Sequence, residues 1–290
     1  MIALRKLVSR FNRTLYKNLK TRKEISRLYG EGHAASKLLA DALSSVLENS
    51  TSREEKQWID RIESLREALN ASSSEISIVD YGAGSSGLNL SREEMYQGRV
   101  VTRTIGEVCR TASKPQKWAF LLFKLIREFR PSICLELGTS LGISTAYQAA
   151  ALELNHRGRI VTLEGAESLA SLARENFTKL GLERVDVVVG RFQDNLGGVL
   201  RQQAPVDFAF IDGHHDEEAT LAYFEQIAPF LAENAIVVFD DISWSKGMER
   251  AWNTIIGDKR VRVSIDLFSL GICIVADSPG EKQRVKLALD

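Results

Sequence analysis

The feature that most constrains the fold is a regular alternation of short apolar runs with amphipathic helical patterns, which begins near Pro115. Five runs have the length of buried strands and each leads into a helical stretch: Ile133–Leu137, Arg159–Glu164, Val185–Val189, Val206–Asp212 and Ala235–Asp240. Strands that alternate with helices form a parallel sheet covered on both faces. Two last runs, Val261–Phe268 and Gly271–Ala276, follow each other too closely for a crossover helix, so they pair antiparallel. The sequence therefore predicts an α/β fold: a doubly wound, seven-stranded Rossmann-like sheet with an antiparallel terminal hairpin.

The chain divides in sequence into two parts, a mainly helical N-terminal extension over residues 1–113 and the alternating part over residues 114–290. Within the extension, residues 76–87 predict a strand followed by a second glycine loop. This loop fits a generic nucleotide-binding pattern, but a short charged stretch follows it and the next strand pattern, Val100–Ile105, ends without an acid. We therefore interpret the segment as a structural or lid element that precedes the sheet.

The composition is that of a globular protein without a strong overall charge. The chain has 38 Lys plus Arg and 38 Asp plus Glu, so no net electrostatic field indicates nucleic-acid binding. The three cysteines are scattered in apolar contexts, which is typical of a reducing compartment. We expect a cytoplasmic protein, which can also form a homo-oligomer. Residues 1–30 differ: they contain nine Lys/Arg and one acid, and apolar residues recur between these at helical spacing. They predict an interfacial helix on an anionic membrane, an organellar targeting segment, or a solvated helix packed on the body or on a partner.

A glycine loop directly after the first buried strand predicts a ligand site. Gly138 and Gly142 allow backbone N–H groups to approach a ligand, and the following helix N-terminus favours a carboxylate or a phosphate. Glu136 places a negative charge beside this loop, which repels a pyrophosphate and attracts a ligand with an amino group and a sulfonium. S-adenosylmethionine is such a ligand, and we expect the intervening Thr139 and Ser140 to contact it as well.

Acidic residues also end the later strands, where the ligands of doubly wound sheets bind. Glu164 stands where such folds hold ribose hydroxyls. Asp212, Asp240 and Asp241 could hold one hard dication such as Mg²⁺, which would acidify a substrate hydroxyl. The alternative is that Asp212 contacts the amino group of the cofactor while the other two cap the next helix. His215, three residues after Asp212, is a candidate general base and is favoured over its neighbour His214.

With these residues in place, residues 114–276 resemble class I S-adenosylmethionine-dependent methyltransferases, in particular the catechol O-methyltransferase-like and methyltransferase-24 types. The resemblance rests on the segment from Glu136 to Ser144 and on the Asp-Gly-X-His and Phe-Asp-Asp-Ile segments that end at His215 and Ile242. It implies that Gly138, Gly142 and Ser144 line the methionine part of the cofactor. It also implies ribose binding by Glu164, magnesium binding by Asp212, Asp240 and Asp241, and His215 as base.

Three functions stay open on the sequence. The favoured one is an enzyme that transfers a methyl group from S-adenosylmethionine to a hydroxyl of a small molecule or sugar. A nicotinamide-dependent oxidoreductase on the same fold is an alternative, although Gly138 and Gly142 have GxxxG rather than GxGxxG spacing. The third is a non-catalytic binding protein that docks through its basic N-terminal helix, on a peripheral membrane surface or on a partner.

Overall fold

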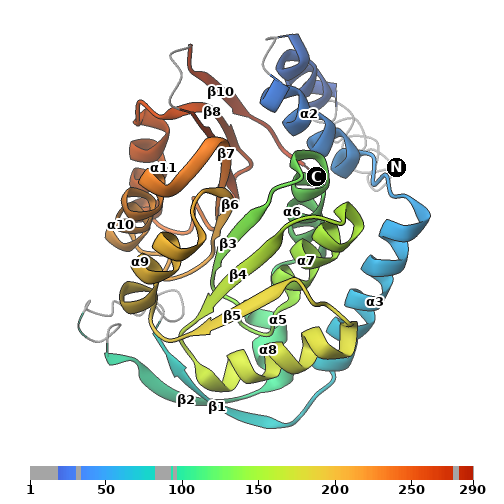
Figure 1. The fold of residues 1–290 in the computed structure, drawn as a ribbon, viewed down its shortest axis with the longest axis vertical. Coiled ribbons are helices and arrows are strands. Elements are labelled where there is room, and N and C mark those ends of the chain that lie inside the picture. The colour runs from blue at the N-terminus through green and yellow to red at the C-terminus, as the bar shows by residue number, and fades with distance from the viewer. Residues whose placement is uncertain (1–18, 31–33, 82–92, 94–96, 277–280, 290) are drawn as a thin grey trace, which may run out of the picture.

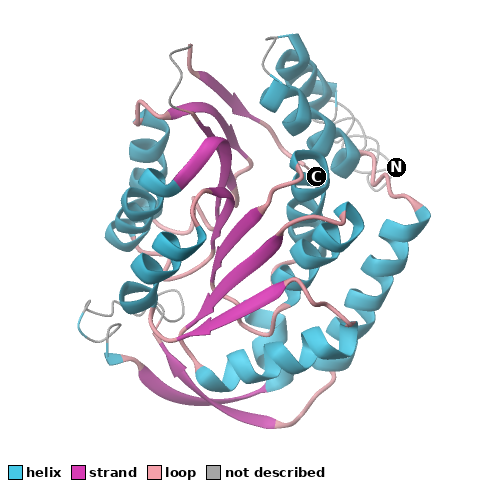
Figure 2. Ribbon diagram, in the orientation of Figure 1, coloured by secondary structure: helices cyan, strands magenta, loops and turns pink. Residues whose placement is uncertain are grey.

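A mixed sheet between two layers of helices forms the centre of the computed structural model of this chain, which describes residues 19–30, 34–81, 93, 97–276 and 281–289 (Figures 1 and 2). Across these residues the sheet has eight strands in the order β10-β8-β9-β7-β6-β3-β4-β5. The strands are β3 (Ile133–Leu137), β4 (Arg159–Glu164), β5 (Val185–Val189), β6 (Val206–Ile211), β7 (Leu231–Phe239), β8 (Val261–Asp266), β9 (Gly271–Val275) and β10 (Gln283–Lys286). β3 to β7 are parallel, and β9 is antiparallel to both β7 and β8. The predicted fold class is confirmed, with β8 and β9 as the terminal hairpin.

The edge strand β10 makes the sheet one strand wider than the sequence predicts. It lies parallel to β8 and consists of Gln-Arg-Val-Lys, with Val285 as its buried residue. Such a short strand has no apolar run that would show in the sequence. Charged side chains are common on edge strands because they oppose pairing with another chain.

Both faces of the sheet are buried, as a parallel sheet with crossover helices requires. Helices α6 (Gln116–Phe129), α7 (Ile143–Asn155) and α8 (Glu167–Leu180) cover one face, and α9 (Phe192–Gln203), α10 (Glu217–Ile227) and α11 (Lys246–Gly257) cover the other (Figure 1). Side chains alternate between the two layers: Cys134 packs with the first set of helices, whereas Leu135 and Leu137 pack with the second. The strand order reverses between β3 and β6, which is where ligands bind in such sheets.

The N-terminal helices continue the first layer. α2 (Ala34–Leu47) packs on α6, and α3 (Arg53–Asn70) packs on α7. A buried ion pair joins α3 to α6, with Lys124 Nζ 2.7 Å from Glu55 Oε2. Residues 19–30 are helical, Ile25 and Leu28 are buried, and the Thr21 hydroxyl donates to the carbonyl of Ala288 at 2.8 Å. The described part of the basic segment therefore packs one face on the body; residues 1–18 of that segment lie outside the described residues.

An antiparallel hairpin lies across the carboxyl ends of the parallel strands. It consists of β1 (Glu75–Asp80) and β2 (Arg99–Thr104) and runs along the lower edge of the molecule in Figure 1. The Ser168 hydroxyl at the start of α8 donates to the carbonyl of Ser77 at 2.7 Å and ties the hairpin to the helix layer. The predicted second glycine loop lies mostly outside the described residues, and α5 (Ile105–Ala112) follows the hairpin.

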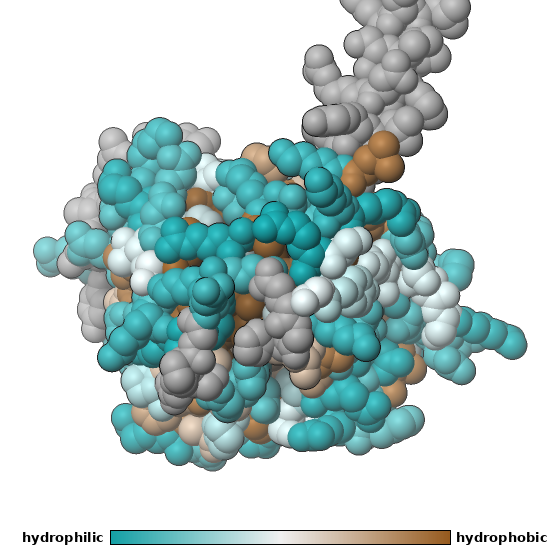
Figure 3. Space-filling model, turned by 90° about the horizontal axis from the view of Figure 1, so that it is seen from above, coloured by the Kyte–Doolittle hydropathy of each residue, from teal (hydrophilic) through white to brown (hydrophobic). Residues whose placement is uncertain are grey.

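The end of the molecule opposite the hairpin is mainly hydrophilic, with hydrophobic atoms in small groups (Figure 3). Among the described residues, none of the helices combines the length and the apolar character that a membrane span requires.

Candidate functional site

A cavity of about 690 Å³ lies between the carboxyl ends of the parallel strands and the β1–β2 hairpin. Its lining includes most of the residues that the sequence predicts at the strand ends: Gly138, Ser140, Glu164, Asp212, His215, Asp240 and Asp241. Residues 78–81 at the end of β1 form the opposite wall. The tertiary fold therefore brings together side chains that are more than 100 positions apart in the sequence.

Two carboxylates and one lysine form the charged centre of this cavity. Asp212 follows β6 and Asp240 follows β7, and Lys114 reaches both of them from the segment before α6. The Lys114 ammonium donates a short hydrogen bond to Asp240 Oδ2 and lies 3.4 Å from Asp212 Oδ2. The side chains of Lys114, Asp212 and Asp240 are 11%, 14% and 3% exposed, so solvent screens these contacts weakly.

Burial and mutual contact move the pKa values of these groups in different directions. Burial and the neighbouring Asp240 raise the pKa of Asp212 well above its usual range, although Lys114 acts in the opposite direction. Burial acts to raise the pKa of Asp240 too, but Lys114 and a hydrogen bond from Asp212 hold it below its usual range. Burial acts to lower the pKa of Lys114, but the attraction of the two carboxylates is the stronger effect. The pKa of Lys114 is therefore raised. Asp240 and Lys114 are therefore the firmly charged pair.

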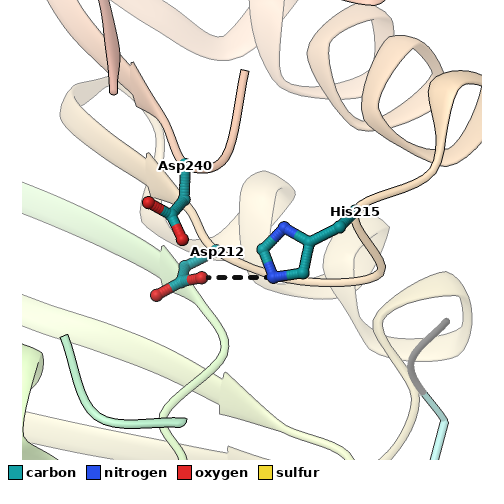
Figure 4. A group of neighbouring side chains, drawn as sticks. All are labelled: Asp212, His215 and Asp240. Carbon is teal, nitrogen blue, oxygen red and sulfur yellow. Dashed lines mark ion pairs between the residues drawn. The ribbon is translucent and has the colours of Figure 1, made fainter. Parts of the chain in front are cut away.

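His215 points at the carboxylate pair, whereas its neighbour His214 does not. The Nε2 atom of His215 lies 3.6 Å from Asp212 Oδ1 (Figure 4). Its Nδ1 atom lies 3.9 Å from Asp241 Oδ2. His214 is buried and its Nδ1 is 2.9 Å from the Tyr223 hydroxyl. Burial lowers the pKa of His214 to about 4, which keeps it neutral near neutral pH. Both histidines line the cavity, but His215 faces the carboxylates whereas His214 is buried against Tyr223.

The predicted metal ligands do not all come together. Within the described part of the chain, Asp212, His215 and Asp240 offer ligand atoms within 4.8 Å of one another, and His215 stands where Asp241 was expected. Asp241 lines the same cavity but is not part of this group, and its Oδ2 lies 3.9 Å from His215 Nδ1. The backbone of Asp241 is also left-handed, with φ 51°.

The glycine loop has a different internal arrangement from the one that the sequence suggests. Glu136 is buried in β3, on the side that faces α7. It accepts hydrogen bonds from Ser144 Oγ at 2.8 Å, Gln148 Nε2 at 2.6 Å and Thr162 Oγ1 at 2.7 Å. Thr145 donates a fourth bond. Neither Glu136 nor Ser144 is among the residues that line the cavity. The expectation that Glu136 faces the ligand is therefore corrected: its side chain points along the pleat into the core, where four donors satisfy it.

The two positions of the loop require glycine for different structural reasons. Gly138 lines the cavity with φ +105°, and a Cβ atom there would lie 2.0 Å from the carbonyl oxygen of Asp212. Gly142 has φ +83° and begins α7, and a Cβ atom there would lie 2.6 Å from the Phe177 ring. Thr139 is buried, with its hydroxyl 2.7 Å from that of Thr162. In this loop, Gly138 and Ser140 are the members that face the cavity.

Glu164 lines the cavity at the end of β4, where the sequence predicts a ribose-binding acid. Its two oxygens accept the backbone N–H groups of Ser140 at 2.7 Å and of Ala166 at 2.9 Å. Burial raises the pKa of this carboxyl, and the backbone hydrogen bonds oppose the increase. Each carboxylate oxygen has a second lone pair, so hydroxyl groups of a ligand can still donate to it.

The sequence reasoning missed several residues of the cavity wall. Lys114 and Arg110 come from the segment before the first parallel strand, and Tyr81 packs its ring against Gly165, where a Cβ atom would lie 2.6 Å away. Lys114 precedes a proline, and Tyr81 follows a hairpin strand. Neither position belongs to a sequence motif that would mark it as part of a site. Trp244 is 49% exposed and lines the cavity beside His215.

Comparisons with known proteins agree with this geometry. Residues 135–242 match the methyltransferase-domain family Methyltransf_24. A catechol O-methyltransferase from Niastella koreensis is 34% identical over 110 residues, which are 37% of this chain and 48% of that protein. The chain thus spans about half the length of this curated relative.

Solved structures share the fold. An O-methyltransferase from Bacillus cereus in complex with S-adenosylhomocysteine has a TM-score of 0.50 and 26% identity, over 58% of this chain and 84% of that one. A methyltransferase from Podospora anserina, also bound to S-adenosylhomocysteine, has a TM-score of 0.50 and 18% identity, over 57% and 81%, and supports the fold alone.

The fold of this chain is similar to that of solved S-adenosylhomocysteine-bound methyltransferases. Residues 135–242 match the methyltransferase-domain model, and the sheet shares its fold with the Bacillus cereus O-methyltransferase, so the comparisons agree with the resemblance noted in the sequence.

Proposed function

We propose that this protein transfers the methyl group of S-adenosylmethionine to a hydroxyl oxygen of a small molecule. The observation that carries the proposal is one cavity in which Glu164 stands at the end of β4 while Asp212 and His215 follow β6. A nucleoside with its ribose at Glu164 would extend across the switch point toward Asp212. The O-methyltransferase relatives support the same reaction class.

The cofactor side of the cavity combines hydrogen-bond acceptors with an unpaired hydroxyl. Glu164 would accept from the ribose hydroxyls, and the Ser140 hydroxyl has no hydrogen-bond partner among the described residues. A buried polar group without a partner is costly, so a ligand that pairs with Ser140 gains affinity. The oxygens of Asp212 and Asp240 also lie at the cavity, where they can accept hydrogen bonds from a ligand.

The transfer forms an oxygen–carbon bond to the acceptor and breaks the carbon–sulfur bond of the cofactor, which leaves S-adenosylhomocysteine. The acceptor hydroxyl must lose its proton, and we assign His215 as the base that receives it. Its ring lies within 4 Å of Asp212 on one side and of Asp241 on the other, and both carboxylates would stabilise an imidazolium. Trp244 lies beside the ring and could pack against an apolar part of the acceptor.

Several expectations from the sequence stay predictions. Mg²⁺ at Asp212, Asp240 and Asp241 is one of them, and Lys114 competes with it for two of those carboxylates. Nothing in the described part of the chain assigns the acceptor beyond a hydroxyl compound that fits the cavity. The division at residue 113, the contacts of residues 1–18, the oligomeric state and the cytoplasmic location are proposals of the same kind.

Cofactor binding is tested by calorimetry with S-adenosylhomocysteine. Glu164→Ala is expected to weaken binding by about 10-fold or more, since it removes the acceptor for the ribose hydroxyls. The matched control is Glu167→Ala, whose carboxylate is 70% exposed in the first turn of α8. Absence of S-adenosylhomocysteine binding by the wild-type protein would refute the proposed function.

The base is tested with a pair of variants that share a backbone conformation. His215 and His156 have φ values of 45° and 51°, a region that asparagine tolerates. His215→Asn is expected to lower the rate of methyl transfer by about 100-fold or more, with unchanged S-adenosylhomocysteine affinity. His156→Asn, at the end of α7, serves as the control. Equal rates for both variants would remove His215 from the mechanism.

A further inference from the structure

We propose that the ammonium group of Lys114 is the resident cation of the site, in the place that a divalent metal would otherwise take, and that it binds the acceptor oxygen during methyl transfer. The proposal rests on the function proposed above and adds a residue that no sequence motif marks. Lys114 is fixed by three independent contacts. Its ammonium is paired with Asp240, lies 3.4 Å from Asp212 Oδ2, and stands 6.0 Å from the centre of the Phe210 ring.

The position of this ammonium excludes a dication between the same oxygens. Mg²⁺ requires carboxylate oxygens at about 2.0–2.1 Å and Ca²⁺ at about 2.3–2.6 Å. Lys114 Nζ faces Asp240 Oδ2 and Asp212 Oδ2, whereas His215 Nε2 faces the other oxygen of Asp212, Oδ1. A dication there would also be repelled at short range by the ammonium, in a region that solvent screens weakly. A metal ion that uses these two Oδ2 atoms therefore does not fit while Lys114 stays in place.

The charge balance of the centre supports the same assignment. The nearest counter-charge to the two buried carboxylates is the Lys114 ammonium, and Asp240 is 3% exposed, so it needs a cation whether or not a ligand is bound. The lysine side chain comes from the residue before Pro115, which begins α6, and α6 is buried along most of its length. A rigid helix thus holds the origin of this side chain, as a preorganised site requires.

The ammonium has an N–H bond to spare for a ligand. An ammonium has three donors, one of which is used by Asp240, and Asp212 Oδ2 lies 3.4 Å away. Lys114 is part of the cavity lining, beside Asp212 and His215. A hydroxyl oxygen that accepts from Lys114 would therefore lie near the base. As His215 takes the proton, the ammonium would stabilise the negative charge that develops on the oxygen.

The test is a titration of the full-length wild-type protein with Mn²⁺, followed by electron paramagnetic resonance or calorimetry, in parallel with Lys114→Met. We expect no saturable Mn²⁺ binding by the wild-type protein and unchanged methyl transfer in EDTA. Lys114→Met is expected to gain saturable Mn²⁺ binding, because it vacates the position between the carboxylates, and to lose about 100-fold in transfer rate in EDTA. The matched control is Lys117→Met, which removes the ammonium that lies 5.3 Å from the Trp118 ring.

The two proposals fail in different ways. Stoichiometric Mn²⁺ binding by the wild-type protein together with loss of transfer in EDTA would overturn the role of Lys114 and leave the methyltransferase function standing. Failure of the wild-type protein to bind S-adenosylhomocysteine would overturn the function, whatever Mn²⁺ does. The wild-type titration decides the question even if Lys114→Met does not fold, and equal transfer rates for Lys114→Met and Lys117→Met would also overturn the proposal.

Discussion

Replacement of Gly138 by alanine is a sharp test of how the glycine loop holds the site. The residue has φ +105°, and an added Cβ atom would lie 2.0 Å from the carbonyl oxygen of Asp212. The backbone conformation costs an L-residue about 1–3 kcal/mol. A clash with backbone cannot be relieved by a rotamer change, and overpacking of this kind costs about 1–3 kcal/mol more. We therefore expect Gly138→Ala to lower the free energy of unfolding by about 4 kcal/mol.

Gly181→Ala is the matched control for this prediction. Gly181 ends α8 with φ +68°, and an added Cβ atom would meet nothing within 4 Å. This variant carries the cost of the left-handed backbone without a clash, about 1–2 kcal/mol. Equilibrium unfolding in urea measures the free energy of unfolding of both variants. The clash in Gly138→Ala would displace the backbone of Asp212, and calorimetry with S-adenosylhomocysteine shows whether this displacement changes ligand binding. If Gly138→Ala were as stable as Gly181→Ala and bound the ligand normally, the close approach of the β3 and β6 loops would not support the site.

Two further predictions concern buried charges. The pKa of His214 is lowered from 6.5 to about 4 by burial; the unfolded chain therefore binds the extra proton first, and stability is lost as pH falls from 6.5 toward 4, by up to about 3 kcal/mol. Urea unfolding between pH 6.5 and 4 should show that the free energy of unfolding depends less on pH in His214→Asn than in the wild-type protein. An equal pH dependence in the two proteins would show that His214 is not the group responsible. Lys124→Met leaves Glu55 buried with Arg127 as its remaining cation and should cost about 3 kcal/mol, whereas Lys56→Met, which breaks an exposed pair, should cost less than about 1 kcal/mol. Similar unfolding midpoints for the two lysine variants would show that the α3–α6 ion pair contributes little.

The predictions that succeeded rest on features that repeat along the chain. The alternation of strand and helix patterns decides the layers, because parallel strands need crossovers and both faces of the sheet must be covered. The same rule brings the ends of β3, β4, β6 and β7 to one edge, so Glu164, Asp212 and Asp240 were expected to meet, and they line one cavity.

The predictions that differed concern the direction of individual side chains. Glu136 is still in β3 and its side chain is buried in the core, whereas Gly138 lies just past the end of the strand, with φ +105°, and lines the cavity. His215 rather than Asp241 completes the group of ligand atoms around Asp212, and both of these residues have left-handed backbones that no local pattern predicts. β10 was missed because its four residues carry no hydrophobic period.

The sequence by itself determined the fold class, the edge of the sheet where the site lies, and most of the acids that surround it, because these follow from periodicity and from the topology of parallel strands. The tertiary structure decided what those acids contact. Lys114 is 126 positions from Asp240 and belongs to a segment without a motif, yet it provides the positive charge at the centre of the cavity. Such a contact depends on how α6 packs against the sheet, and the cost of burying unpaired carboxylates makes it a requirement of the folded state.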